Sequence, residues 1–402
     1  MIMIEKYLGY WPVIVGSAVF LLIGLFLWLT AERGVERSRK SLSWVREYRQ
    51  PGFPLRAEVL SCRPVPFWEI LTAAVFALAV SVGLRVLASY AITGSYTRIL
   101  LSRYYIVNAG VSVIGAVSVA LLLHVLFDSR AVTVLGALLF AAAPADGHVA
   151  ACLIALTLLL LVLYLRCERS GFVPELLYLL AALAMACAIA VQPRTVFFAP
   201  FVVLAHWYKL ISLRRADKLR FGTLVLALLA ALICWCAFAV FSALLRSFMI
   251  CNFGVRTLLI FLRARGLKLI CAELYYFVLE QALAVPMRSL LLYPMLEAPL
   301  FGLGVFGAVS AVRIGVIRRN PRGWLCLIVL ILTAAVWLAT GCYTVTLGLA
   351  LCLGCLLKNC VVGKKTGWAV AACVLGALYM LAIAASSWLL PLVQGLTERI
   401  TA

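Results

Sequence analysis

The strongest constraint on this chain is a succession of long apolar runs separated by short, mostly basic segments. An apolar run of about 20 residues can cross the ~30 Å hydrocarbon core of a membrane as an α-helix. About 11 or 12 runs reach or approach that length. They lie at residues 11–30, 67–92, 107–127, 131–144, 148–165, 174–192, 195–212, 221–245, 297–317, 323–341, 343–358 and 367–391. The sequence therefore predicts an all-α, polytopic transmembrane helical bundle. The short run 131–144 is expected to be extended by its flanks or enclosed by other helices.

The composition excludes a soluble globular enzyme. Hydrophobic residues make up 66% of the chain and charged residues 12%. Soluble domains are about 45–50% apolar, and about a quarter of their residues are charged. Only the membrane class accounts for so many apolar residues spread over so many runs.

The net charge is strongly basic, with 35 Lys and Arg against 15 Asp and Glu, or +20. Nucleic-acid binding needs a polar domain with clustered bases and aromatic platforms. No stretch here is long and polar enough, so we expect no nucleic-acid partner. Short cytoplasmic loops of membrane proteins are enriched in Lys and Arg, and this enrichment explains the excess.

The first run, 11–30, sets the orientation. It is too long for a cleavable signal peptide, and an Arg-rich segment follows it instead of preceding it. It is interpreted as a signal-anchor helix with its N-terminus outside. The loops then assigned to the inner side carry roughly twice as many bases as the outer ones. We expect an integral, multi-pass protein of the cell envelope, in a bacterial cytoplasmic membrane, with both termini outside.

This orientation divides the chain into five parts. They are the anchor helix 1–30, a basic cytoplasmic connector 31–66, core helices 67–245, an outer loop 246–296 and C-terminal transmembrane helices 297–402. A full crossing by the apolar part of 246–296 would move a later basic segment to the outside. That part is therefore interpreted as an interfacial or re-entrant helix.

The cysteines are expected to be structural, and two of the three histidines are expected to be structural or interfacial. Most of the 14 cysteines lie inside apolar runs, where cysteine behaves as a small hydrophobe. Cys352, Cys355 and Cys360 have a spacing similar to a metal site, but no second cluster accompanies them. His124 and His206 fall near the inner ends of predicted helices.

The third histidine, His148, follows Asp146 in the short outer segment Pro144-Ala145-Asp146-Gly147-His148. Two interpretations stay open. An acid and an imidazole beside an embedded cavity can act as acid and base or bind a metal. Alternatively, the segment is a tight turn in which Asp146 caps the next helix.

From residue 67 to about 360, the order of elements resembles the GT-C glycosyltransferases, in particular the glycosyltransferase 39-like group. The matching stretches are Arg98–Phe127, Leu135–Pro144, 148–166, Gln192-Pro193-Arg194-Thr195 followed by Pro200, and Thr340-Gly341-Cys342-Tyr343. The resemblance implies a polytopic enzyme that uses a polyprenyl-phosphate-linked sugar. It gives Arg194 and Tyr343 functional positions, and it places Asp146 where some members carry a second outer acid.

Two positions depart from the family pattern. The first outer loop, Ser89–Arg98, holds no acid where the family places a general base, and Cys342 stands where many members have Arg. The acids expected on the outer side are Glu5, Asp146, Glu273, Glu280, Glu297 and Glu398. Asp146, assisted by His148, is therefore the predicted base. A divalent metal on this pair is a weak alternative, so no cofactor is firmly expected.

The leaving phosphate needs positive charge, which outer arginines can supply in bidentate form. The predicted substrate-binding residues are Arg98, Arg103, Arg194, Arg263, Arg265 and Tyr343. Three functions remain open: sugar transfer from a polyprenyl-phosphate carrier to a lipid, glycan or protein; carrier binding or scaffolding without catalysis; and a polymerase, flippase or transporter. Expected partners are membrane lipids and the lipid-linked sugar, and nothing indicates an oligomeric state.

Overall fold

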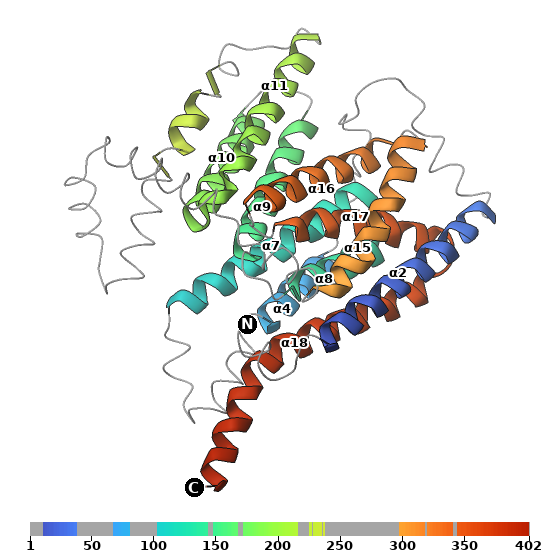
Figure 1. Ribbon diagram of the computed structural model, residues 1–402. Helices are drawn as coiled ribbons and strands as arrows, with labels where there is room; N and C mark the ends of the chain where they lie inside the picture. The colour runs from blue at the N-terminus through green and yellow to red at the C-terminus, as the bar shows by residue number, and fades with distance from the viewer. Residues whose placement is uncertain are drawn as a thin grey trace.

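The protein is a bundle of helices (Figure 1). This computed structural model describes residues 11–37, 67–80, 103–143, 148–167, 172–215, 297–317, 320–340 and 344–401, with helical pieces between 225 and 237. Within these residues there is no β-strand. The predicted all-α bundle is therefore confirmed.

The helices follow the apolar runs closely. They are α2 (Trp11–Arg37), α4 (Phe67–Leu78), α7 (Arg103–Phe127), α8 (Arg130–Ala141), α9 (His148–Arg166), α10 (Phe172–Val191), the 3-10 helix η3 (Pro193–Phe198), α11 (Ala199–Arg215), α15 (Ala298–Val312), the π-helix η4 (Arg313–Ile317), α16 (Pro321–Thr340), α17 (Val345–Val362) and α18 (Thr366–Thr401). In the described part, seven stretches are long and apolar enough to cross a membrane, and four shorter helices are also apolar. The chain is thus a multi-pass integral membrane protein.

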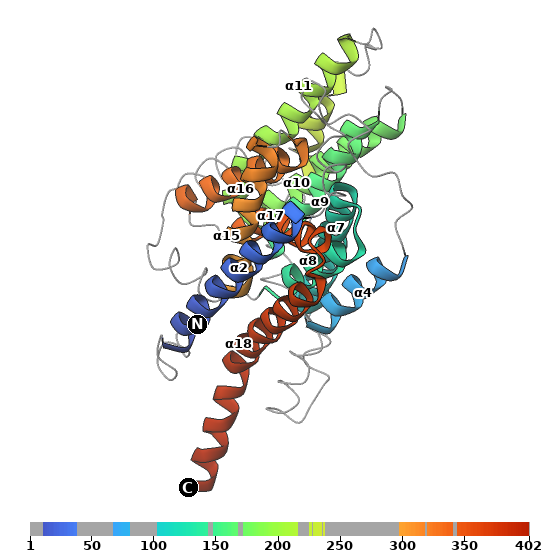
Figure 2. The same cartoon turned by 90° about the vertical axis from the view of Figure 1, so that its right-hand side faces the viewer.

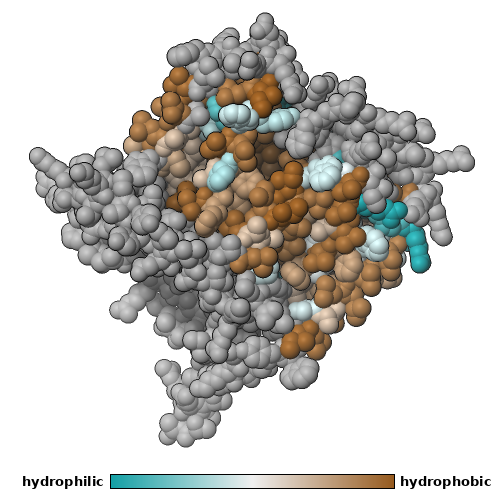
Figure 3. Space-filling view, turned by 45° about the horizontal axis from the view of Figure 1, so that its top comes forward, coloured by the Kyte–Doolittle hydropathy of each residue, from teal (hydrophilic) through white to brown (hydrophobic). Residues whose placement is uncertain are grey.

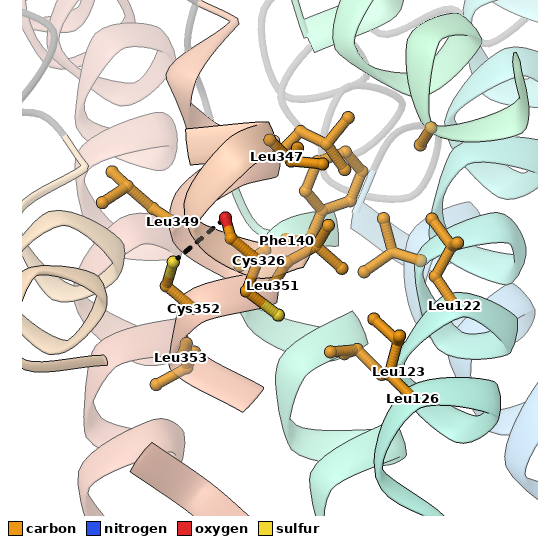
Figure 4. Packing of buried hydrophobic residues seen from close by; sticks show 14 of the residues in the cluster. Leu122, Leu123, Leu126, Phe140, Cys326, Leu347, Leu349, Leu351, Cys352 and Leu353 are labelled. Carbon is orange, nitrogen blue, oxygen red and sulfur yellow. Dashed lines mark hydrogen bonds between the residues drawn. The ribbon is translucent and has the colours of Figure 1, made fainter. Parts of the chain in front are cut away.

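Helix α17 forms the centre of the bundle. In its apolar window 83% of the residues are buried, against 22% for α2 and 28% for α18. It packs against α15, α16, α2, α8 and α7. Its leucines meet side chains of α7, α8 and α16 in the core shown in Figure 4, where the Cys352 thiol donates to the Cys326 carbonyl at 3.6 Å.

The cysteines in this core behave as small packing residues, as the sequence predicts. Among the described residues the buried cysteines are free thiols, namely Cys152, Cys326, Cys352, Cys355, Cys360 and Cys373. Cys251 and Cys271, in the predicted outer loop 246–296, lie outside the described residues.

Glycines set the closest helix approaches. A Cβ on Gly307 of α15 would lie 2.5 Å from the Cys352 backbone of α17, and one on Gly304 would lie 2.8 Å from Leu349. The two contacts advance together along both helices, so α15 and α17 run parallel. Close backbone approach at small residues is the usual way in which membrane helices gain packing energy.

Helix α8 is too short to span a membrane and is enclosed by its neighbours. Most of its residues are buried, and it packs against α7, α4, α17 and α18. Only Asp128 and Ser129 separate it from α7, and Asp128 adopts a left-handed conformation with φ 46°. Lys358 of α17 donates to the Phe127 carbonyl at 2.8 Å and so satisfies the end of α7.

Helix α2 extends to Arg37, beyond the predicted boundary at residue 30. Its last turns are part of the bundle: Glu32 pairs with Arg313 at 2.9 Å and accepts a hydrogen bond from Asn359 at 3.3 Å. A buried carboxylate needs such partners, because an unpaired charge in an apolar medium is costly. The helix therefore extends past residue 30 and includes Glu32, whose partners lie on other helices.

Helix α18 starts beside the end of α2 and runs antiparallel to it. The rings of Phe26 and Trp368 lie 5.7 Å apart, and a Cβ on Gly16 would meet Tyr379. The helix continues to Thr401, beyond the predicted end at 391, and its C-terminal part projects from the rest of the bundle in both views (Figures 1 and 2).

The contacts bring many helix ends together on one side of the bundle. Glu32 joins the ends of α2, α15 and α17, Lys358 joins α17 to the α7–α8 turn, and Arg130 pairs with Glu69 of α4 at 3.4 Å. We call this side the basic end, because it holds the described cations Arg33, Arg130, Arg313, Arg322, Lys358, Lys364 and Lys365.

Exposed aromatic residues gather at the helix starts of this basic end. They are Phe67 and Trp68 of α4, Trp324 of α16 and Trp368 of α18. Between the two ends the described surface is largely apolar, and Figure 3 shows one broad apolar face. Aromatic residues favour the membrane–water interface, so this level marks where the apolar layer ends.

Candidate functional site

Most of the predicted site residues lie outside the residues that the structure describes. These are Arg98, Asp146, Arg263, Arg265 and Tyr343. For Arg103, His148 and Arg194 the structure describes the backbone only. Arg103 is the first residue of α7, His148 is the first residue of α9, and Arg194 lies in η3.

The turn that carries Arg194 is well defined by its neighbours. Gln192 is extended (φ −143°, ψ 102°), as the residue before a proline usually is, and Pro193 ends α10 because it cannot donate the next backbone hydrogen bond. The Thr195 backbone N–H and hydroxyl both donate to the Gln192 carbonyl, at 2.9 and 2.8 Å. Thr195 is fully buried, so this short loop holds the Arg194 backbone in one position.

The helix directions place Arg103, His148 and Arg194 at the end of the bundle away from the basic end, which we call the opposite end. Helix α7 finishes at the basic end, so it begins at the opposite end. Helix α8 therefore runs toward the opposite end, and α9 runs away from it. The rings of Tyr164, near the end of α9, and Tyr178, near the start of α10, lie 5.1 Å apart, so α10 runs antiparallel to α9 and ends at the opposite end. Helix α10 then leads into η3, which also contacts α11 and α16.

A buried carboxylate, that of Glu297, lies at the opposite end. It stands just before α15, with Pro299 in the first turn, and 0% of its surface is exposed. Because α15 and α17 run parallel, Glu297 lies near the level at which α17 begins, where Thr344 is also fully buried. Among the carboxylate side chains that the structure describes, it is the one at this end.

Glu297 was counted among the outer acids from sequence but received no role. The signal that could have singled it out is its position directly before Ala298-Pro299, since a proline in the first turn marks a helix start. A fully buried carboxylate is costly to keep, and perturbed ionisable groups of this kind cluster at functional sites. Glu297 is therefore a second candidate acid beside Asp146.

Two other buried ionisable groups, Lys209 and His206, have structural partners in the last turn of α9, toward the basic end. Lys209 of α11 donates to the Tyr164 carbonyl in the last turn of α9 at 3.3 Å, and its ammonium lies 5.5 Å from the Tyr164 ring centre. His206 forms a hydrogen bond with the Tyr164 hydroxyl through Nδ1 at 3.0 Å, and its ring lies 4.8 Å from the Tyr178 ring in a tilted arrangement. This cluster joins α9, α10 and α11, and His206 is part of it.

Among the side chains that the structure describes, no group of three or more His, Cys, Asp or Glu is arranged to hold a metal ion. Asp146 and the His148 side chain are not among them, so the weak metal alternative remains a prediction. The described residues fit no particular cofactor.

Comparison with known proteins identifies no relative of this chain. No family model, curated protein or solved structure matches this chain. The fold defines the class, a multi-pass helical membrane protein, and the GT-C resemblance of the sequence stays a prediction.

Proposed function

We propose that the chain is a membrane glycosyltransferase of the GT-C kind. It transfers a sugar from a polyprenyl-phosphate carrier to a lipid, glycan or protein acceptor on the outer face of the membrane. The observation that carries this proposal is the common location of Arg103, His148 and Arg194. These residues are far apart in sequence, and their backbones lie at the same end of the bundle as the buried Glu297.

The distribution of charge and aromatic residues supports the orientation. The basic end combines Arg33, Lys364 and Lys365 with exposed Trp68, Trp324 and Trp368. Lys and Arg are enriched in short loops on the cytoplasmic side. The opposite end, with the candidate site, then faces outward, as does the C-terminal end of α18.

The chemistry requires an acid–base group and a cationic cradle. The acceptor hydroxyl oxygen forms a bond to the anomeric carbon of the sugar, the bond from that carbon to the carrier phosphate breaks, and the hydroxyl proton passes to a base. Asp146 is the proposed base, with His148 or Glu297 assisting. Arg194 and Arg103 stabilise the negative charge on the departing phosphate.

The direct test is transfer from a radiolabelled polyprenyl-phosphate sugar in vesicles that contain the purified protein. Asp146→Asn is expected to lower the rate about 100-fold or more, and Arg194→Ala about tenfold or more. Arg214→Ala, at the end of α11 remote from η3, is the matched control and should leave the rate unchanged. Unchanged transfer in both site variants overturns the site assignment. No transfer by the wild-type protein overturns the proposal that it is an enzyme.

Carrier binding without transfer is the second candidate, favoured by the acid-free first outer loop, Ser89–Arg98. In that case the wild-type protein retains the polyprenyl-phosphate sugar in native mass spectrometry but produces no transfer product. A coupled transporter is less well supported. Among the described residues, the buried charges Glu32, Glu69, Glu297 and Arg322 lie toward helix ends instead of mid-span, where coupling residues are usual. Lys209 lies near the middle of α11, but it donates to the Tyr164 carbonyl at 3.3 Å and so has a structural partner.

A further inference from the structure

Three exposed cations lie beside the junction between α2 and the α17–α18 turn. The backbones touch there, since a Cβ on Gly34 would lie 2.7 Å from the Gly363 carbonyl oxygen. Arg33 is the chain neighbour of Gly34, and Lys364 and Lys365 directly follow Gly363. All of these charged side chains are exposed, so the close approach of the two backbones concentrates three positive charges on one small surface.

The acid nearest in sequence does not neutralise this surface. Glu32 turns into the bundle, where its side chain is 7% exposed and is held by Arg313 and Asn359. Within the described side chains, no ion pair joins Arg33, Lys364 or Lys365 to an acid. The next charged residues of α2, Glu36 and Arg37, have opposite signs, and their side chains lie outside the described part.

An exposed aromatic pair lies directly below the cations. Phe26 precedes Arg33 by two helical turns and therefore lies on the same face of α2. Trp368 lies in the first turn of α18, four residues after Lys364 and three after Lys365. The Phe26 and Trp368 rings touch edge to face at 5.7 Å and are 48% and 59% exposed. On each side of the junction, cations at the basic end are thus followed along the helix by an exposed aromatic ring at the edge of the apolar layer, and the two rings are in contact.

We propose that Arg33, Lys364, Lys365, Phe26 and Trp368 form a binding site for an anionic phospholipid in the leaflet at the basic end. Arg33 can grip a phosphate in bidentate form, and the lysines add point charges. The exposed rings below contact the upper part of the acyl chains. A soluble anion can bind only the cations of this surface, whereas a phospholipid can bind the cations with its headgroup and contact the aromatic rings with its acyl chains.

This site is independent of the proposed sugar transfer, which takes place at the opposite end. It gives the otherwise peripheral helices α2 and α18 a shared ligand. Because α2 is bound to α15 and α17 through Glu32, a lipid held between α2 and α18 also fastens α18 to the rest of the bundle.

The test measures retention of dioleoyl-phosphatidylglycerol against dioleoyl-phosphatidylcholine by the full-length protein in native mass spectrometry. The variant carries Arg33→Gln, Lys364→Gln and Lys365→Gln. The matched control removes the same charge elsewhere, by Arg214→Gln, Arg215→Gln and Lys218→Gln. Each base near a membrane surface contributes a factor of about five in affinity, so the variant should bind phosphatidylglycerol at least tenfold more weakly. The control should retain wild-type binding.

Three outcomes overturn the proposal. The first is retained phosphatidylglycerol binding in the variant, and the second is an equal loss in the control, which would indicate net charge alone. The third is displacement of the lipid by inorganic phosphate or an equal preference for a polyprenyl phosphate. A second readout does not depend on these charge variants. Phosphatidylglycerol with brominated acyl chains should quench the tryptophan fluorescence of the wild-type protein more than that of the Trp368→Phe variant. Equal quenching in the two proteins overturns the proposal as well.

Discussion

Buried polar side chains in this protein work in small groups that connect helix ends. Glu32 is the clearest case, because one carboxylate receives Arg313 and Asn359 from two other helices. Neither partner adjoins it in sequence, so no local pattern identifies the group. The sequence does show an acid in a strongly basic segment, which is the only signal available before the fold is known.

Replacing Glu32 with Gln is expected to destabilise the bundle. Removing one member of a fully buried pair costs about 3–5 kcal/mol, and the 31% exposure of the Arg313 side chain lowers the expected loss to roughly 2 kcal/mol. Thermal unfolding of the purified protein, followed by intrinsic fluorescence, measures the change. Arg33→Gln, one residue away and exposed, should shift the midpoint little. An equal shift in both variants would contradict the structural role of Glu32.

At the candidate site, Thr195 is expected to act as a positioning residue for Arg194. Thr195→Val removes the hydroxyl bond to the Gln192 carbonyl, worth about 0.5–1.5 kcal/mol, and loosens the turn. The expected result is a higher KM for the donor with a smaller change in kcat. Thr157→Val on α9 removes a comparable buried bond to the Leu153 carbonyl and is the control. If both variants behave alike in the transfer assay, the turn has no role in donor binding.

At the scale of elements, the apolar runs predict the helices well because a span must be both long and apolar. The run 148–165 matches α9, and 343–358 matches α17 apart from a few terminal residues. The run 131–144 matches α8, and the structure selects the enclosed alternative for it. Helix directions follow from short connections. The pairing of helices could not be predicted, because apolar residues cover all sides of these segments and leave no stripe that identifies a partner.

Glycine positions decide the pairing instead, and Gly307 offers a test. A methyl group on Gly307 would meet the Cys352 backbone at 2.5 Å, so Gly307→Ala must push α15 away from α17. Overpacking of this kind costs about 1–3 kcal/mol.

The matched control is Gly110→Ala on α7, where a Cβ would meet nothing within 4 Å. Alanine is the better helix former by about 1 kcal/mol, so this variant should be as stable as the wild type or more so. Thermal midpoints of the two variants in the same detergent provide the comparison. A lower midpoint for Gly110→Ala than for Gly307→Ala would contradict the packing described for α15 and α17.

For the whole molecule, the basic end and the opposite end predict an orientation that fusions can measure. Alkaline phosphatase joined after Ala402 should be active, and green fluorescent protein at the same point should be dark, since the C-terminal end of α18 would lie outside. Fusions after Lys365 should give the reverse pattern, because this residue lies at the basic end. Opposite results at the two positions would invert the proposed orientation and place the candidate site inside.

The candidate site itself was only partly predictable. The proline before Arg194 indicates a fixed turn from sequence alone, and the structure shows how Thr195 holds it. The burial of Glu297 could not be foreseen, because it depends on the parallel packing of α15 against α17. Asp146 and Tyr343 lie outside the described residues, so their roles remain predictions.

The central position of α17 has a consequence for the order in which the protein is made. Helices leave the ribosome from the N-terminus onward, and α17 is the last but one to be synthesised. Until it enters the membrane, α2, α7, α8 and α15 can pack only against one another and their other neighbours, such as α2 on α15 and α7 on α8 and α9, and they lack the central helix. The bundle is therefore incomplete until α17 is inserted. A chain interrupted just before Val345 should be a preferred substrate for membrane proteases, whereas one interrupted after α17 should already resist them.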